Sequence, residues 1–200
     1  MLKDMNYYIS DLHLFHKNVT RIGKGYDDRP FDNPEEMNIV IKDKWNSKVN
    51  NGDVVYILGD MAMRGKQENL IAFVSTLNGH KVLVKGNHDD IRDQRYKQLF
   101  EEICDYKELN DTLDGENVKL ILCHYPILMW KDQHRGSILL YGHVHNSIEE
   151  YYFQKCLSDM DNEEFFDRRA GNKVLRAYNT GCMMPYMDYE PRTLKEIVYG

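Results

Sequence analysis

Five short polar clusters carry the residue types needed for metal chemistry. They combine carboxylate, amide and imidazole side chains, and each directly follows a run of residues with β-strand character. In chain order they are Asp11-Leu12-His13, Gly59-Asp60, Gly86-Asn87-His88-Asp89, His124 and Gly142-His143-Val144-His145. This mixture of oxygen and nitrogen donors suits Mn, Fe, Co, Ni or Zn better than it suits Ca or Mg alone.

Each cluster taken alone also has a purely structural explanation. An Asp after a strand commonly forms a turn or caps a helix, and Gly86 would be explained by a tight turn that needs an unusual φ. Two clusters, however, contain residues two apart, Asp11/His13 and His143/His145. Residues two apart in an extended segment point to the same side, so each pair can present two ligands to one cavity.

The elements between the clusters predict how they come together. Strands are expected at residues 6–10, 54–58, 81–85, 106–109, 118–123, 138–141 and 174–178. Helices are expected at 34–49, 67–77, 90–100 (with Asp90 as N-cap) and 191–197, while 149–172 stays unassigned. In the first helix, Met37, Ile41 and Trp45 recur at spacing four. Such alternation predicts α/β layers around sheets, whose strand C-terminal ends converge on a ligand-binding crevice.

The ordered series of clusters resembles the calcineurin-like metallophosphoesterase superfamily over about residues 5–181. The segments 9–18 and Cys123-His124-Tyr125-Pro126 are most similar to small bacterial and phage members of that superfamily. The resemblance implies one domain over residues 1–200. It also implies a four-layer α/β/β/α sandwich with a binuclear metal site at strand C-terminal ends.

The resemblance further implies which residues hold the metals. Asp60 would bridge two divalent cations. The remaining ligands of the first cation would be Asp11, His13 and His145. The remaining ligands of the second cation would be Asn87, His124 and His143. Manganese is the favoured metal, with Fe, Zn, Co or Ni as alternatives.

A phosphate ester would be the substrate, attacked by a hydroxide that the two metals hold. His88 is the candidate general acid or phosphate-contacting group, and orientation of a ligand is its alternative. Asp89 would hold His88 in one tautomer or cap the next helix. Arg64 would reach a phosphate oxygen, and His16 and Asn18 would line the substrate side; a solvated loop residue is the alternative for all three.

Phosphodiesters are favoured over monoesters, because the sequence shows no obvious set of several arginines that could bind the dianion of a monoester. Met63 stands where protein Ser/Thr phosphatases have an Asp before the matching Arg, which disfavours a protein phosphatase. Two further hypotheses are a non-catalytic metal-binding scaffold of the same fold, and a nuclease acting on short or single-stranded ends.

The composition is that of a globular protein and limits its partners. Of 200 residues, 42% are hydrophobic and 29% are charged. The four cysteines are scattered without a Cys-x-x-Cys pair, which argues against a thiolate zinc site. No run reaches the roughly 18 apolar residues of a membrane span, and no apolar leader is visible, so we expect a cytoplasmic protein. The net charge of −6 disfavours broad binding to duplex nucleic acid.

Overall fold

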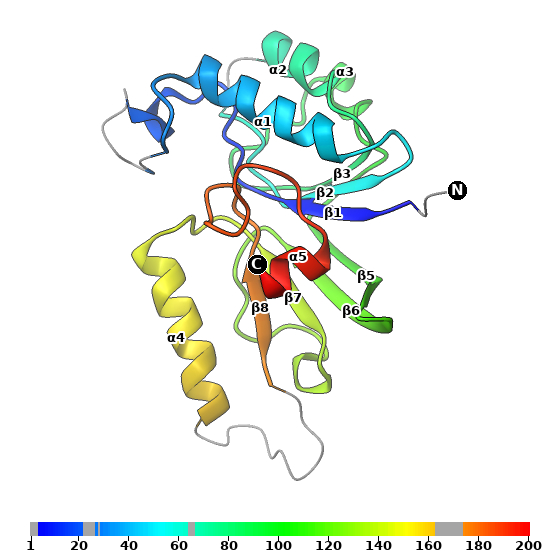
Figure 1. Ribbon diagram of the computed structural model, residues 1–200, viewed down its shortest axis with the longest axis vertical. Helices are drawn as coiled ribbons and strands as arrows, with labels where there is room; N and C mark the ends of the chain where they lie inside the picture. Colours follow the sequence, from blue (N-terminus) through cyan, green and yellow to red (C-terminus); the bar gives the residue numbers. More distant parts are fainter. Residues whose placement is uncertain (1–3, 22–26, 28, 64–66, 163–173) are drawn as a thin grey trace.

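The computed structural model describes residues 4–21, 27, 29–63, 67–162 and 174–200 (Figure 1). Its strands form two four-stranded sheets that pack against each other, with helices on the outer side of each sheet. The layers therefore follow the order α/β/β/α, and the predicted fold class is confirmed.

The first sheet is entirely parallel. Its order is β1 (Asn6–Ile9), β2 (Val54–Ile57), β3 (His80–Val84) and β4 (Glu102–Cys104). Both faces of this sheet are covered, which explains the continuous apolar runs in its strands. Ile9 pairs with Ile57, and Ile57 pairs with Leu83, so three strands end at nearly the same level. The polar clusters that follow them leave from one edge.

Helices α1 (Pro34–Lys48), α2 (Gln67–Val74) and α3 (Gln94–Lys97) lie on the outer face of this sheet. The start of α1 is fixed by Asn33, whose side chain accepts a hydrogen bond of 2.8 Å from the backbone N–H of Glu36. The predicted stripe of Met37, Ile41 and Trp45 is fully buried against the core.

The helix predicted over residues 90–100 is wrong in its extent. Asp90 does not start it, because its carboxylate accepts from the backbone N–H and the Nε–H of Arg92 in a local turn. Asp93 is the N-cap instead, accepting from the backbone N–H of Arg95 at 2.8 Å. The three-residue strand β4, which follows, was not predicted.

The second sheet is mixed. Its order is β5 (Tyr106–Leu113), β6 (Glu116–Cys123), β7 (Ile138–Tyr141) and β8 (Arg176–Asn179). Strands β5 and β6 form an antiparallel hairpin at Asp114-Gly115, where both residues have positive φ. Strands β6, β7 and β8 are parallel to one another.

Alternation along β6 divides the second sheet between two cores. Leu120 and Leu122 pack into the cluster shared with the first sheet, whereas Ile121 packs with Phe153 and Leu157 of α4 (Ile148–Asn162). The tract left unassigned in the sequence therefore begins as a helix that covers the outer face of this sheet (Figure 1). Residues 163–172 of that tract lie outside the described part of the chain.

The two sheets are joined where β1 and β8 end. The backbone N–H of Ser10 donates to the carbonyl of Thr180 at 2.8 Å, and that of Cys182 donates to the carbonyl of Ser10 at 3.0 Å. Helix α5 (Leu194–Tyr199), capped by Thr193, packs against β1 and β5. Within the described ranges, no helix has the length and apolar character to span a bilayer.

Candidate metal centre

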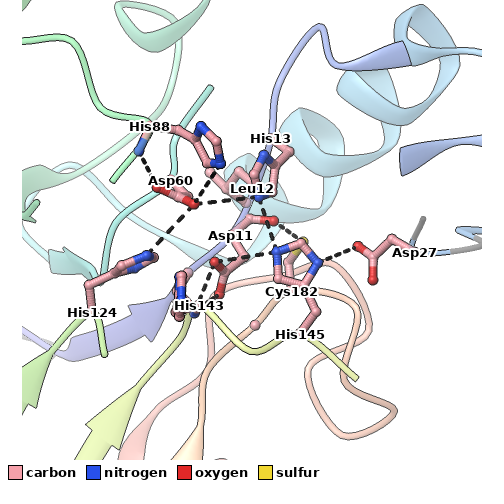
Figure 2. Close-up of polar contacts among 12 residues, drawn as sticks. Asp11, Leu12, His13, Asp27, Asp60, His88, His124, His143, His145 and Cys182 are labelled. Carbon is pink, nitrogen blue, oxygen red and sulfur yellow. Dashed lines mark hydrogen bonds and ion pairs between the residues drawn. The ribbon is translucent and has the colours of Figure 1, made fainter. Parts of the chain in front are cut away.

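The five predicted clusters meet at the edge where strands of both sheets end (Figure 2). Backbone hydrogen bonds hold the clusters together. The N–H of Asp11 donates to the carbonyl of Gly59 at 3.0 Å, and the N–H of Gly142 donates to the carbonyl of His124 at 2.9 Å. The predicted convergence of strand ends on one crevice is therefore present in the fold.

One group of donors, the first subsite, consists of Asp11, His13 and His145. One ligand atom from each lies within 4.8 Å of the others, and all three side chains are buried. Nε2 of His145 lies 3.1 Å from Nε2 of His13 and 3.7 Å from Oδ1 of Asp11. Ligand atoms lie about 2.0–2.2 Å from a bound transition metal, and three donors gathered this closely could share one cation.

A second group, the second subsite, consists of Asp60, His124 and His143, again with ligand atoms within 4.8 Å of one another. The amide oxygen of Asn87 lies 3.1 Å from Nε2 of His124 and adds a fourth donor. Oδ2 of Asp60 lies 3.7 Å from Nε2 of His124 and also 3.7 Å from Nε2 of His13. This single oxygen therefore faces both subsites.

The backbone at both subsites is left-handed, in contrast to the extended segments assumed from the sequence. Positive φ occurs at the carboxylate and imidazole residues Asp11, His13, Asp60, His143 and His145. Such values are uncommon for residues other than glycine, and they cluster where function requires an otherwise unfavourable conformation. Both members of each Asp-x-His or His-x-His pair share this conformation, and in this way they reach the same cavity.

Two glycines are required by close approach to the ligands. The sequence suggested that Gly86 provides the positive φ of a tight turn, but its φ is not positive. Glycine is needed there because a Cβ would collide with the carboxylate of Asp60. A Cβ on Gly142 would lie 2.5 Å from Oδ2 of Asp11. The glycines in the Gly-Asn-His and Gly-His-x-His clusters therefore make room for the donor side chains.

Burial and local charge set the pKa values of the site. Burial lowers the pKa of His13 well below its ordinary value and also lowers that of His143, so both favour the neutral form that binds metals. Burial raises the pKa of Asp11. His145 differs, because its hydrogen bond with Asp27 and the charge of Asp11 outweigh burial and raise its pKa.

Neighbouring groups orient several of the donors. Nδ1 of His124 lies 2.8 Å from the carbonyl oxygen of Leu58, which leaves its Nε2 free to face a cation. The hydroxyl of Ser10 donates to Oδ2 of Asp11 at 2.6 Å. The side-chain amide of Asn179 donates to the carbonyl of His145 at 2.9 Å. Residues at the ends of β1, β2 and β8 thus support the ligand loops.

His88 lies beside the two subsites. Its Nε2 is 3.9 Å from Oδ2 of Asp60, its side chain is 36% exposed, and its backbone N–H donates to Oδ1 of Asp60 at 2.9 Å. A half-exposed imidazole fixed next to the shared carboxylate can meet a substrate that enters from solvent. His16 is close by, with its ring centroid 5.4 Å from that of His13.

Asp89 has a different environment from the one predicted. Its carboxylate accepts hydrogen bonds from the backbone N–H groups of Asp60, Met61 and Gly86 at 2.8–3.0 Å. It therefore ties two ligand loops together, in place of the expected contact with the His88 ring or the expected cap of the next helix. The cap is Asp93.

Two further predicted substrate contacts stay predictions. Asn18 is exposed and lies in the short 3-10 helix η1 (Lys17–Val19). Arg64 lies outside the described residues.

Sequence reasoning missed a buried ion pair behind the first subsite, formed by Asp27 and Arg29. Oδ2 of Asp27 lies 2.7 Å from Nε of Arg29 and 3.1 Å from Nδ1 of His145. The sequence signal is an acid two residues before an arginine, which is equally typical of a surface ion pair. Burial would raise the pKa of Asp27, but His145 and Arg29 bring it below its usual value.

The chain belongs to the calcineurin-like phosphoesterase family, whose model matches residues 7–178. It is a metal-dependent phosphoesterase, and the family together with the two Asp/His groups points to a binuclear divalent metal site.

Individual relatives support this membership. The chain is 34% identical over 149 residues to the uncharacterized protein MJ1445 of Methanocaldococcus jannaschii, covering 74% of this chain and 73% of that protein. It is 32% identical over 164 residues to the Gene 66 protein of Mycobacterium phage D29, covering 71% of this chain and 79% of that protein. A solved structure, the protein of unknown function AQ665 from Aquifex aeolicus, is similar at a TM-score of 0.62 and 25% identity. That match covers 94% of this chain and 95% of the other.

Proposed function

We propose that this protein hydrolyses phosphate esters, preferentially phosphodiesters, with two divalent cations held in the two subsites. The observation that carries the proposal is the position of Asp60. Its Oδ2 lies 3.7 Å from an imidazole nitrogen of each subsite, at His13 and His124, which supports a bridging role. Mixed carboxylate, imidazole and amide donors favour a first-row transition metal, and we propose manganese.

The charges of the loaded site favour an anionic substrate. Two divalent cations carry +4, and the carboxylates of Asp11 and Asp60 carry −2, so +2 remains to attract a phosphate ester. When bound, such a pair of cations supplies an activated water and stabilises charge on the phosphoryl oxygens. Burial lowers the pKa of His13 and of His143, which favours the neutral form that can bind metal.

His88 is proposed to contact the phosphate or to protonate the leaving oxygen. The hydrogen bond from its backbone N–H to Asp60 fixes its place, while its exposed ring leaves Nε2 accessible to substrate. His16, next to His13, is proposed to line the same side of the site. Both roles require the ring, and neither requires the residue to bind a cation.

Two features support a phosphodiester over a monoester. The guanidinium of Arg29 is directed at Asp27 and at backbone carbonyls, so it adds no contact for a second phosphate charge. A cavity of about 350 Å³ adjoins the subsites and is lined by His143, His145 and the residues that lead into α4. That cavity offers room for the second substituent of a diester.

The test is a hydrolysis assay with Mn²⁺, comparing bis-p-nitrophenyl phosphate with p-nitrophenyl phosphate. We expect the diester to be hydrolysed faster by the unmodified protein. Asp60→Asn should lower turnover by about 10³-fold or more, because metal stabilisation of the transition state is worth several kcal/mol. Asp159→Asn, which changes an exposed carboxylate of α4, is the matched control and should retain full activity.

Comparable turnover by Asp60→Asn would contradict the bridging role, and faster monoester hydrolysis would reverse the substrate preference. Metal binding without hydrolysis of any ester would favour a non-catalytic scaffold.

One observation favours a nuclease for short or single-stranded ends as a second candidate. Tyr125 is 45% exposed, and its ring centroid lies 4.6 Å from that of His143. An exposed aromatic ring beside a phosphate site can stack a nucleobase. Tyr125→Ala should then weaken cleavage of a dinucleotide much more than cleavage of bis-p-nitrophenyl phosphate, whereas equal effects would exclude base stacking.

A further inference from the structure

We infer that Asp27 and Arg29 are positioning residues that set the cation affinity of the first subsite without binding the cation themselves. The inference rests on the proposed binding of metal at two subsites. It goes beyond that proposal because the cation affinity of one subsite would depend on two residues outside all five ligand clusters.

Arg29 holds the main chain of the first cluster. Its side chain is fully buried, Nη2 donates to the carbonyl of Asp11 at 2.8 Å, and Nη1 donates to the carbonyl of Leu12 at 2.9 Å. A buried guanidinium is tolerated only when its charge and donors are satisfied, so its position is tightly constrained. Both acceptors belong to the segment in which Asp11 and His13 adopt left-handed φ. The guanidinium therefore stabilises an otherwise unfavourable turn.

Asp27 links this guanidinium to a donor of the same subsite. Its side chain is 4% exposed, and its Oδ2 contacts Nε of Arg29. The same oxygen contacts Nδ1 of His145 (Figure 2). A contact at Nδ1 fixes both the tautomer and the orientation of the ring. Nε2 of His145 is then directed at His13 and Asp11, where the first cation would lie. The pair thus aligns two ligand segments at once.

The second subsite uses a different support. Nδ1 of His124 is held by the carbonyl of Leu58, which is main chain and is present whatever the side chains are. A change at residue 27 should therefore act on one subsite and spare the other. This selectivity distinguishes a positioning role from a general contribution to stability.

The experiment is calorimetric titration of the metal-free protein with Mn²⁺, for the unmodified chain, Asp27→Ala, Asp27→Asn and the control Asp159→Asn. We expect Asp27→Ala to weaken one of two sites by about 10–100-fold, the range found for lost outer-shell partners, and to leave the other unchanged. Asp27→Asn, which keeps a side-chain oxygen for Arg29 and His145 but removes the negative charge, should weaken the same site less. The control should match the unmodified protein.

A second readout reports the ring directly. In ¹⁵N NMR of the metal-free protein, the His145 ring should lose its preference for the Nδ1–H tautomer in Asp27→Ala, and the melting temperature of each variant records folding. Unchanged affinity at both sites, or equal weakening of both, would overturn the inference. If Asp27→Ala does not fold, Asp27→Ser, whose shorter side chain also removes the contact with Nδ1 of His145, takes its place; wild-type affinity at both sites and an unaltered tautomer in that variant would overturn the inference equally. Failure of the unmodified protein to bind two Mn²⁺ would instead reject the proposed function.

Discussion

The two candidate metal subsites are built from similar donors but are supported in different ways. The second subsite relies on its own loops, where the carbonyl of Leu58 orients His124 and Asn87 adds its amide oxygen. The first subsite relies on Asp27 and a fully buried Arg29, neither of which belongs to a ligand cluster. The second subsite is thus largely self-contained within short motifs, whereas the first depends on a remote charged pair.

The difference extends to protonation. Burial lowers the pKa of His143 in the second subsite, while Asp27 and Asp11 raise the pKa of His145 in the first. The carboxylate that orients His145 also favours its protonated form. His145 should consequently be protonated at a higher pH than His143.

Among residues that belong to neither subsite, His88 should give the largest effect when it is substituted. His88→Ala should lower turnover by about 10²–10⁴-fold, the usual contribution of a general acid or base, if His88 has the proposed role beside Asp60, whose Oδ2 lies 3.9 Å from its Nε2. Both cations should remain, as measured by elemental analysis of the dialysed protein. Loss of a cation would show that His88 is a ligand and that the division into two subsites is incomplete.

Substitution of one glycine beside each subsite should have a smaller effect, and the two substitutions should affect different cations. Gly142→Ala places a Cβ against the carboxylate of Asp11, and Gly86→Ala places one against Asp60 and the ring of His124. Each should cost about 1–3 kcal/mol of stability by thermal denaturation, as overpacking does. Gly142→Ala should lower the affinity of the first subsite for its cation. Gly86→Ala should lower the affinity of the second subsite and displace the carboxylate of Asp60, which both subsites share.

Gly52→Ala is the matched control for both glycine variants, because its Cβ would meet only the side chain of Asp4. Its stability and metal content should stay near those of the unmodified protein. If Gly142→Ala and Gly86→Ala had the same effect on both cations, the subsites could not be treated separately.

The smallest predicted effect is a difference in pH dependence. A raised pKa means that His145 keeps its proton to a higher pH than an ordinary imidazole, whereas the lowered pKa values of His13 and His143 mean that they lose theirs at lower pH. As pH falls, His145 of the first subsite should therefore be protonated before His143 of the second. NMR titration of the histidine rings in the metal-free protein measures this order directly, and a His145 that titrates below His143 would reverse it.

Much of the fold follows from local sequence patterns. The stripe of Met37, Ile41 and Trp45 identifies α1, and the apolar run at residues 138–141 matches β7. The third helix was overestimated because Asp90 hydrogen-bonds to Arg92, a preference that competes with helix capping and that spacing alone does not reveal. Strand β4 is three residues long and owes its pairing to β3 rather than to its own composition.

The candidate metal donors could also be predicted from a local pattern, which is their position after a strand. Each stands at the end of a strand, and parallel strands bring such ends together whatever the connecting loops do. The left-handed φ of Asp11 and His145 was not predictable, because it is imposed by tertiary contacts. The same holds for Asp89 and Arg29, whose partners are backbone groups distant in sequence and therefore leave no local pattern.

The most direct test of the central claim is to locate the cations in crystals grown with Mn²⁺, using anomalous scattering. Two peaks per chain are expected, one among Asp11, His13 and His145 and one among Asn87, His124 and His143, with Asp60 coordinating both. A single peak, or two peaks of which only one contacts Asp60, would contradict the proposed binuclear centre.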